Sequence, residues 1–372
     1  MAHSVEEATF TIDPCELHIL EEGPKTETTL ARKDALHYYK QMVTIRRMET
    51  AAGNLYKEKA IRGFCHLCSG QEAIYVGIAN ALREHDSVIT SYRAHGFTYV
   101  MGVPVLGVLS ELTGRSSGCV CGKGGSMHMY AHNFYGGNGI VGAQVPLGAG
   151  IGFASRYRGE GGVNFSLYGD GAANQGQVFE AYNIAKLWNI PAVFICENNG
   201  YGMGTSQDRH AATTDFYKRG DYIPGVKVNG MDILAVKEAT EFALDYCGKQ
   251  DKGPLVYEMV TYRYSGHSMS DPGTSYRTRE EVQDVRQTRD PILGFKEKIV
   301  AAGLADADEL KKMEMEVRKS VDADVKKAKT DPEIGVEELY YDVYENNLQG
   351  NLRGLLPWEK HEHKKTQKAL NL

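Results

Sequence analysis

The hydrophobic and polar positions of the chain change period along its length, and each period predicts a kind of element. Residues 163–168 alternate as a half-buried strand does, and residues 191–196 (PAVFIC) form a short apolar run typical of a buried strand. Between the two runs, apolar residues recur at helical spacing: Val178, Phe179, Tyr182, Ala185 and Trp188. We therefore expect a strand, a crossover helix and a second strand, whose right-handed connection makes the strands parallel neighbours.

Other segments extend this pattern. Residues 1–30 have few periodic positions and are predicted to form an extended arm. Residues 31–59 are predicted to be helical, and so is the charged segment 280–329. Strands and helices are expected to resume after Asn229, through residues 255–264. The charged residues of the first helix, Arg46, Arg47 and Glu49, are expected at the surface or at an interface.

No internal repeat, low-complexity tract or linker divides the chain. We predict one α/β domain, residues 31–345, with an amino-terminal arm (1–30) and a carboxyl-terminal extension (346–372). Its expected architecture is a mostly parallel twisted sheet with helices on both faces. A chain of 372 residues, 42% of them hydrophobic, can bury a substantial core of this kind.

Charge and cysteine usage narrow the class of protein. A net charge of −6 gives no general attraction to nucleic acid or to an anionic membrane, so neither is expected as a partner. No apolar run approaches the roughly 18 residues of a membrane span. Seven scattered cysteines favour reduced thiols over a disulfide scaffold. A zinc site built from Cys65, Cys68, Cys119 and Cys121 remains a less favoured alternative, because the second pair is spaced too closely.

Polar residues follow the two predicted strands at their carboxyl ends. Gly169, Asp170 and Gly171 end the first, and after 26 residues Asn198 and Asn199 end the second. Since the ends of neighbouring parallel strands meet at one sheet edge, a carboxylate and an amide oxygen are expected together there. A small cation such as Mg²⁺ prefers such oxygens, and a diphosphate and water can complete its six positions. A GDG tripeptide alone usually marks only a turn, but the asparagine pair at this distance favours a metal site.

This spacing resembles the thiamine-diphosphate-binding motif, in which GDG is followed at a distance by NN. Five further segments are similar to the alpha subunits of pyruvate dehydrogenase: FCHLCSGQEA (64–73), YRAHG (92–96), GKGGSMHMY (122–130), GGNGIVGAQVP (136–146) and YRYSGHSMSDPGTSYRTR (262–279). The similarity covers nearly the whole chain, from about Phe10 to about Tyr344. It implies the thiamine-diphosphate-binding fold of the 2-oxo acid dehydrogenases.

The resemblance assigns roles to individual residues. Mg²⁺ is expected on Asp170, Asn199 and the carbonyl of Tyr201, and Met203 is expected to support the bent cofactor. The other expected cofactor-binding residues are Tyr92, Arg93, Ala131, Gly139, Val141, Gly171, Ala172, Arg263 and His267. His66 and His267 are the expected catalytic histidines, and His66 and Tyr92 are expected to contact substrate. We interpret the Gly-rich segment 110–160 as a cradle for the cofactor; it lacks the Ser or Thr that follows lysine in a Walker motif.

The implied activity is thiamine-diphosphate-dependent oxidative decarboxylation of pyruvate, with reductive acetylation of a lipoyl group, in a mitochondrial multienzyme complex. A glutamate that such enzymes need lies on the beta subunit, so we expect an alpha chain that is inactive alone and assembles as two alpha and two beta chains. The lipoyl domains of dihydrolipoyl acetyltransferase, pyruvate dehydrogenase kinase and the matching phosphatase are the other implied partners. The location implied is the mitochondrial matrix. The acidic amino terminus is unlike a transit peptide, so either the protein is not imported or this is its processed form, and the resemblance favours the second.

The resemblance also implies control by phosphorylation at Ser268, Ser275 and Ser206, two of them in or beside the Gly- and Ser-rich loop 264–276. A phosphate beside a diphosphate is expected to disorder that loop through charge repulsion. Two positions depart from the family pattern. Ser265 stands where animal sequences carry a histidine, and Gly200 replaces a larger residue, which is expected to loosen the metal loop.

Three alternatives belong beside this interpretation. A branched-chain 2-oxo acid dehydrogenase alpha subunit has the same metal motif, although the segment GHSMSDP favours the pyruvate type. A non-catalytic homologue with a regulatory or scaffolding role is disfavoured by the intact Asp170, Asn199, Arg93 and His267. A self-contained thiamine enzyme such as a transketolase requires a much longer chain.

Overall fold

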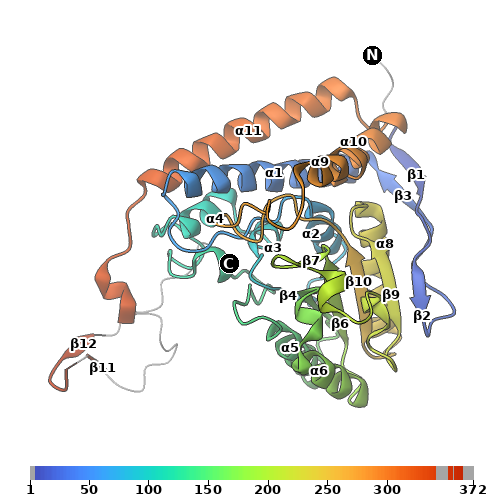
Figure 1. Cartoon of the computed structure of the whole chain (residues 1–372), viewed down its shortest axis with the longest axis horizontal. Coiled ribbons are helices and arrows are strands. Elements are labelled where there is room, and N and C mark those ends of the chain that lie inside the picture. The colour runs from blue at the N-terminus through green and yellow to red at the C-terminus, as the bar shows by residue number, and fades with distance from the viewer. Residues whose placement is uncertain (1–4, 341–350, 355, 363–372) are drawn as a thin grey trace.

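A single mixed sheet organises the molecule (Figure 1). The computed structural model describes residues 5–340, 351–354 and 356–362. The sheet has six strands, in the order β2 (Glu16–His18), β9 (Gly225–Asn229), β10 (Leu255–Val260), β6 (Ala192–Asn198), β5 (Asn164–Gly169) and β4 (Ser87–Ile89). Every neighbouring pair is parallel except β2 with β9, which is antiparallel. The predicted mostly parallel sheet is thus confirmed, and its two sequence-predicted strands, β5 and β6, are direct neighbours.

Helices cover both faces of the sheet, because successive side chains of its strands point to opposite sides. In β5, Phe165 and Leu167 pack into the cluster formed with α1 (Arg32–Lys57), α2 (Glu72–Ala79) and α8 (Ile233–Ala243). Tyr168 packs on the other side, against α5 (Gln144–Arg158) and α6 (Gly176–Leu187). The crossover helix expected between the two strands is α6, and Trp188 ends it.

The remaining elements surround this three-layer body. The predicted helical segment 280–329 forms three helices, α9 (Arg279–Thr288), α10 (Pro291–Ala301) and α11 (Ala307–Thr330), and α11 packs along α1 (Figure 1). The other elements are α3 (His95–Val100), α4 (Val105–Leu112), α7 (Gln207–His210), β7 (Tyr201–Gly202), β8 (Thr205–Ser206), β11 (Asn351–Arg353), β12 (Lys360–Glu362) and the short helical turns η1 (Gly125–Met127), η2 (Ala172–Asn174), η3 (Phe216–Lys218), η4 (Leu244–Lys249) and η5 (Val336–Tyr340). Part of the expected carboxyl-terminal extension lies outside the described residues.

The arm is more ordered than a simple extension. Its strands β1 (Glu7–Thr11) and β3 (Glu27–Ala31) pair antiparallel, and β2 between them forms the edge of the central sheet. Pairing of β2 with β9, which the weak periodicity of this segment did not reveal, therefore ties the arm to the central sheet, while β1 and β3 pair with each other.

Of the three charged residues of the first helix expected at the surface or at an interface, the expectation is wrong for Glu49 alone. Arg46 and Arg47 are both partly exposed, with 27% and 30% of their side chains accessible. Glu49 is fully buried, and Arg46 is ion-paired with the fully buried Glu72 and, at 3.0 Å, with Asp290. Arg47 pairs with a residue of α11. Buried charges require such partners, and helical periodicity alone does not identify them.

Candidate active site

The carboxyl ends of β5 and β6 open into one cavity of about 360 Å³. Asp170 follows β5 and Asn199 follows β6, and parallel pairing of the two strands brings both residues to its wall. Tyr201 and Met203, from the loop after β6, line the same cavity. The topology thus brings together the three residues expected to hold a cation, as the strand-helix-strand pattern predicts.

Asn199 has a free oxygen in this wall. Its Nδ2 donates to Oε1 of Gln71 at 3.3 Å, whereas its Oδ1 is buried and has no hydrogen-bond partner. Gln71 is held in turn, because its Nε2 lies 3.1 Å from Tyr75 Oη and 3.1 Å from a carboxylate oxygen of Glu197. An unpaired buried acceptor is costly unless a ligand satisfies it, and a cation beside the Asp170 carboxylate does so. The donor set therefore fits a small divalent metal.

The two asparagines of the pair have different tasks. Nδ2 of Asn198 donates to Glu258 at 2.9 Å, and its Oδ1 accepts from the backbone N–H of Gly200 at 3.1 Å. Gly200 has a φ of +83°, a conformation that favours glycine. Gly200, which departs from the family pattern, therefore suits the backbone conformation of this turn. The Asn198 side chain holds the turn by accepting its hydrogen bond.

Close approach of two backbones explains the second glycine of the GDG sequence. A Cβ atom on Gly171 would lie 3.0 Å from the Cα of Gly202. Gly171, Gly202 and Ala172 all line the cavity, so small residues keep the loops after β5 and β6 in contact while leaving room for a ligand.

Three rings meet beside the metal-binding edge. The ring centroid of His66 lies 4.7 Å from that of Tyr92 and 5.3 Å from that of His267, and Tyr92 and His267 are also 5.3 Å apart. Tyr92 and His267 line the cavity, while His66 lies behind them. Burial, reinforced by the nearby Arg93, lowers the pKa of His66 to about 3 and that of His267 to about 4. Both imidazoles are therefore neutral at pH 7, and the Nδ1 atom of each is buried without a partner.

Two buried arginines support this edge from behind rather than lining the cavity. Arg93 donates to the backbone oxygens of Leu67 and, at 3.1 Å, His267. Arg263 donates to the backbone oxygen of Met203 at 3.0 Å and to Tyr276 Oη at 2.9 Å. Burial and the neighbouring Arg93 lower the pKa of Arg263 to about 10, which leaves it charged at neutral pH. The two guanidinium groups add positive potential and fix loop carbonyls.

A buried polar chain holds the segment that carries His66. The carboxylate of Glu49 accepts from the backbone N–H of Cys68 at 2.9 Å and faces Nδ1 of His95 at 2.9 Å. Nε2 of His95 lies 2.9 Å from Oγ of Ser126, which also accepts from the backbone N–H of His66 at 3.0 Å. Helix α1, helix α3 and turn η1 therefore clamp residues 66–68 at two backbone positions.

The GKGG segment does not form the cofactor cradle that we expected. Its backbone N–H groups close on the carboxylate of Glu111, at the end of α4, with N···O distances of 2.8 Å from Gly122, 2.6 Å from Gly124 and 3.2 Å from Gly125. The N–H of Val120 joins them at 2.9 Å. Glycine-rich backbone binds anions, and here the anion is internal. The glycine-rich sequence indicated a set of backbone N–H donors, but it did not show that the Glu111 carboxylate would be their acceptor.

The cavity wall differs in part from the predicted set. It is formed by Ser91, Tyr92, Val141, Gln144, Gly169, Asp170, Gly171, Ala172, Asn199, Tyr201, Gly202, Met203, Thr205, His210 and His267. Ala131 and Gly139 do not line it. Sequence reasoning missed Gln71 and Gln144, which lie within two of the quoted segments but were given no role there, and His210, which lies in none of them. Of the serines expected to be modified, Ser268 is buried, Ser275 is exposed and Ser206 is intermediate.

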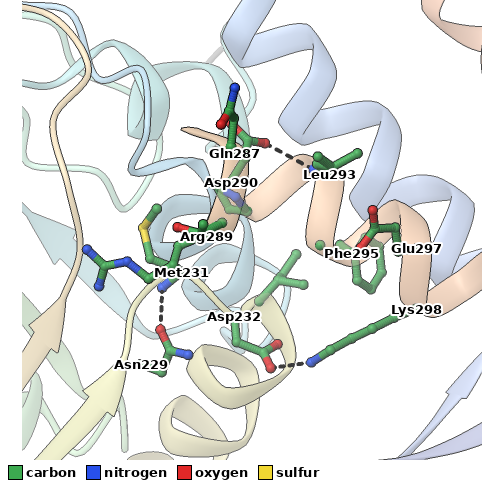
Figure 2. Close-up of a pocket in the computed structure, with 14 residues that line it drawn as sticks. Asn229, Met231, Asp232, Gln287, Arg289, Asp290, Leu293, Phe295, Glu297 and Lys298 are labelled. Carbon is green, nitrogen blue, oxygen red and sulfur yellow. Dashed lines mark hydrogen bonds and ion pairs between the residues drawn. The ribbon is translucent and has the colours of Figure 1, made fainter. Parts of the chain in front are cut away.

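A second cavity, of about 250 Å³, lies between α8 and α10 (Figure 2). Several of its polar side chains are already paired: Lys298 with Asp232 at 2.5 Å, Asn229 with the backbone N–H of Met231, and Asp290 with that of Leu293. This cavity therefore does not have the unsatisfied acceptor of the first.

The zinc alternative finds no support in the described part of the chain, where no group of three or more His, Cys, Asp or Glu side chains is placed to hold a metal. All seven cysteines are free thiols, as predicted. Among the described residues, no helix is long and apolar enough to cross a membrane.

Comparison with known proteins places the chain in a family. Residues 40–337 match the family described as Dehydrogenase E1 component. The chain is 61% identical to a probable pyruvate dehydrogenase E1 component subunit alpha, mitochondrial, of Caenorhabditis elegans, over 94% of this chain and 87% of the relative. It is 59% identical to the somatic form of the alpha subunit of Homo sapiens, over 95% and 90% of the two chains. It is 62% identical to the type II alpha subunit of Ascaris suum, over 91% and 87%.

The fold and these matches define the chain as a member of the dehydrogenase E1 component family. Within that family it belongs with the mitochondrial pyruvate dehydrogenase E1 alpha subunits, which confirms the resemblance seen in its motifs.

Proposed function

We propose that this chain is the alpha subunit of a pyruvate dehydrogenase E1 component and binds thiamine diphosphate through Mg²⁺ at the β5–β6 edge. The observation that carries the proposal is the buried, unpartnered Oδ1 of Asn199, which shares a cavity with the Asp170 carboxylate. The Tyr201 carbonyl is the third proposed ligand. Three protein oxygens leave positions on the ion for diphosphate oxygens and water.

Thiamine diphosphate, when bound, supplies the nucleophilic carbon and the electron sink that decarboxylation of a 2-oxo acid requires. The side chains around it bind and orient. Tyr92 and the neutral His267 form the wall next to the metal edge, and the His66 ring packs behind them, tilted against Tyr92 and edge-on to His267, as a neutral hydrogen-bonding group. Met203, in the left-handed conformation with a φ of +57°, stands at the cavity wall as the proposed apolar support of the cofactor.

The same interpretation extends to assembly and location. The relatives are named as alpha subunits of an E1 component, which supports a complex with a beta subunit. We propose two alpha and two beta chains, delivery of the acetyl group to lipoyl domains of an acetyltransferase, and control by a kinase and a phosphatase at Ser268, Ser275 and Ser206. The relatives are named as mitochondrial, and we propose the matrix as the compartment.

Cofactor binding tests the metal site directly. The chain is co-expressed with a beta chain, and thiamine diphosphate affinity is measured by calorimetry with and without Mg²⁺. Wild type is expected to need Mg²⁺, and Asn199→Leu, which removes a ligand oxygen, is expected to lose at least about 100-fold in affinity. Asn80→Ala, outside the cavity at the end of α2, is the control and is expected to bind normally. Equal binding with and without Mg²⁺ would refute the metal site.

Substrate choice needs a separate assay. Decarboxylation of pyruvate is compared with that of branched 2-oxo acids in the assembled complex. A preference for pyruvate is expected. A preference for the branched acids would instead support the related branched-chain enzymes, and no turnover of either, with cofactor binding intact, would support a non-catalytic homologue.

A further inference from the structure

A histidine that no motif singled out touches the proposed metal ligand Asp170. Nε2 of His210, at the end of α7, lies 3.0 Å from Oδ2 of Asp170. The His210 ring lines the cofactor cavity, and only 14% of its side chain is exposed. The ring thus borders both the carboxylate and the space in which a ligand would lie.

Hydrogen-bond chemistry fixes which nitrogen of this ring carries the proton. Arg219 can only donate, and its Nη1 lies 2.7 Å from Oδ1 of Asn174, so that atom is the amide oxygen. Nδ2 of Asn174, which can only donate, therefore faces Nδ1 of His210 at 3.0 Å. Nδ1 must accept, which leaves the proton of the neutral ring on Nε2, directed at Asp170.

We propose that His210 is a positioning residue for Asp170, set in its tautomer by Arg219 and Asn174. Arg219 donates to the Asn174 amide, Asn174 donates to the His210 imidazole, and His210 donates to Oδ2 of Asp170. Because Oδ2 accepts this hydrogen bond, Oδ1 is the less engaged oxygen, and we expect Asp170 to bind the metal through it. Outer hydrogen bonds of this kind orient metal ligands and tune their affinity.

The amide ligand, Asn199, is restrained in the same manner, by a different residue. Gln71 accepts from Nδ2 of Asn199, which leaves Oδ1 of Asn199 toward the cavity. Both side chains thus present a single defined oxygen. A cation that demands near-ideal octahedral geometry, as Mg²⁺ does, gains most from ligands that are fixed in advance.

The inference rests on the proposed function, since it concerns the same metal site, and the experiment separates the two. The protein is the full chain assembled with a beta chain. The measured quantity is the Mg²⁺ concentration that half-saturates binding of thiamine diphosphate, followed by calorimetry, together with the melting temperature of the metal-free complex. If cofactor binding by wild type does not depend on Mg²⁺, the proposed function fails. If wild type depends on Mg²⁺ but the His210 variants require the same Mg²⁺ concentration, only this inference fails.

His210→Ala is expected to raise the required Mg²⁺ concentration by about 10- to 100-fold, the effect typical of an outer-shell partner, without changing the melting temperature of the metal-free complex. His210→Gln keeps a side-chain N–H donor and is expected to restore most of the affinity. His37→Ala, at an exposed position of α1, is the control and is expected to match wild type. A wild-type Mg²⁺ requirement in His210→Ala would overturn the inference.

The choice of cation distinguishes positioning from direct ligation. If His210 only positions Asp170, its removal should weaken Mg²⁺ and Mn²⁺ by similar factors, because the metal keeps an all-oxygen set of ligands. If Nε2 instead binds the metal, removal should penalise Mn²⁺ far more than Mg²⁺, since imidazole suits transition metals. A selective loss of Mn²⁺ binding would therefore also contradict the positioning role.

Discussion

Single residues at the active site owe their protonation states to burial and to neighbouring charge. His66 and His267 are both desolvated, and the guanidinium group of Arg93 further disfavours a second positive charge on either ring. Asn199 and Asp170 are likewise fixed by neighbouring side chains, Asn199 by Gln71 behind the cavity wall and Asp170 by His210 within it. At this scale, the chemistry of the site is set by the neighbours of the residues that would bind the ligand.

The two histidines predict an acid-dependent loss of stability. The pKa of histidine in an unfolded chain is about 6.5. Because the pKa values in the folded protein are about 3 for His66 and about 4 for His267, the unfolded chain binds more protons between pH 6.5 and pH 4. The free energy of unfolding therefore rises with pH in this window and falls as the solution is acidified, by at most about 1.4 kcal/mol per pH unit for each histidine.

Urea unfolding of the assembled complex at pH 7, 6 and 5 measures this effect. The double variant His66→Asn, His267→Asn is expected to flatten the pH dependence, whereas His37→Asn, at an exposed position, is expected to leave it as in wild type. An unchanged slope in the double variant would show that other groups cause the acid sensitivity.

Among the connecting segments, the loop between β10 and α9 contributes His267 to the cavity wall and is held by its own side chains. Asp271 accepts from the backbone N–H of His267 at 2.7 Å, from that of Gly273 at 2.8 Å and from Tyr276 Oη at 2.5 Å. Arg277 donates to two backbone oxygens at the start of the segment. The loop is thus ordered by hydrogen bonds rather than by a large apolar core, which makes it sensitive to added charge.

Ser268 is the position where one added charge should open this loop. Its side chain is only 7% exposed, and its Oγ lies 2.8 Å from Oγ of Ser270. In Ser268→Glu, the added carboxylate has to be desolvated at this buried position and is expected to repel a bound diphosphate, so the loop should move outward. Cleavage of residues 264–276 by a protease should accelerate about tenfold for each 1.4 kcal/mol of local stability lost.

The assay is limited proteolysis of the assembled complex, run beside pyruvate turnover. Thr274→Glu places the same charge at an exposed position of the same loop and serves as the control. Wild-type turnover together with wild-type protection in Ser268→Glu would show that repulsion at this residue does not control the loop.

For the whole molecule, the sequence predicted the arrangement of the strands that carry the site better than the side-chain contacts within it. Strand periodicity and the spacing of Asp170 and Asn199 predicted their meeting point, because parallel strands joined by a helix admit few arrangements. The partner of the GKGG backbone and the contact between His210 and Asp170 were not predictable, since they depend on how distant segments pack. Likewise, the position of Glu49 in its helix did not reveal that this carboxylate is buried against His95.

A cluster of exposed apolar side chains lies on α5 and α6. On α5 and directly after α6, Phe153, Tyr157 and Trp188 form a ring cluster, with centroids 5.7 Å apart for Phe153 and Trp188 and 6.2 Å apart for Phe153 and Tyr157. Tyr157 is 84% exposed, and Leu147 and Leu187 extend the same two helices with exposed side chains. Exposed apolar clusters of this kind mark protein–protein contacts.

We expect this α5–α6 cluster to be covered by another subunit of the E1 complex, so that charge placed on it should block assembly and leave the chain folded. The double variant Phe153→Glu, Trp188→Glu is co-expressed with a beta chain, and the mass of the purified species is measured by light scattering after size-exclusion chromatography. A smaller species than wild type is expected, with a wild-type far-ultraviolet circular dichroism spectrum. Met315→Glu, an exposed apolar position on α11 at the opposite side of the molecule, is the control and should assemble normally (Figure 1). Because introduced carboxylates at a buried interface remain unpaired, normal assembly of the double variant would mean that the cluster faces solvent in the complex.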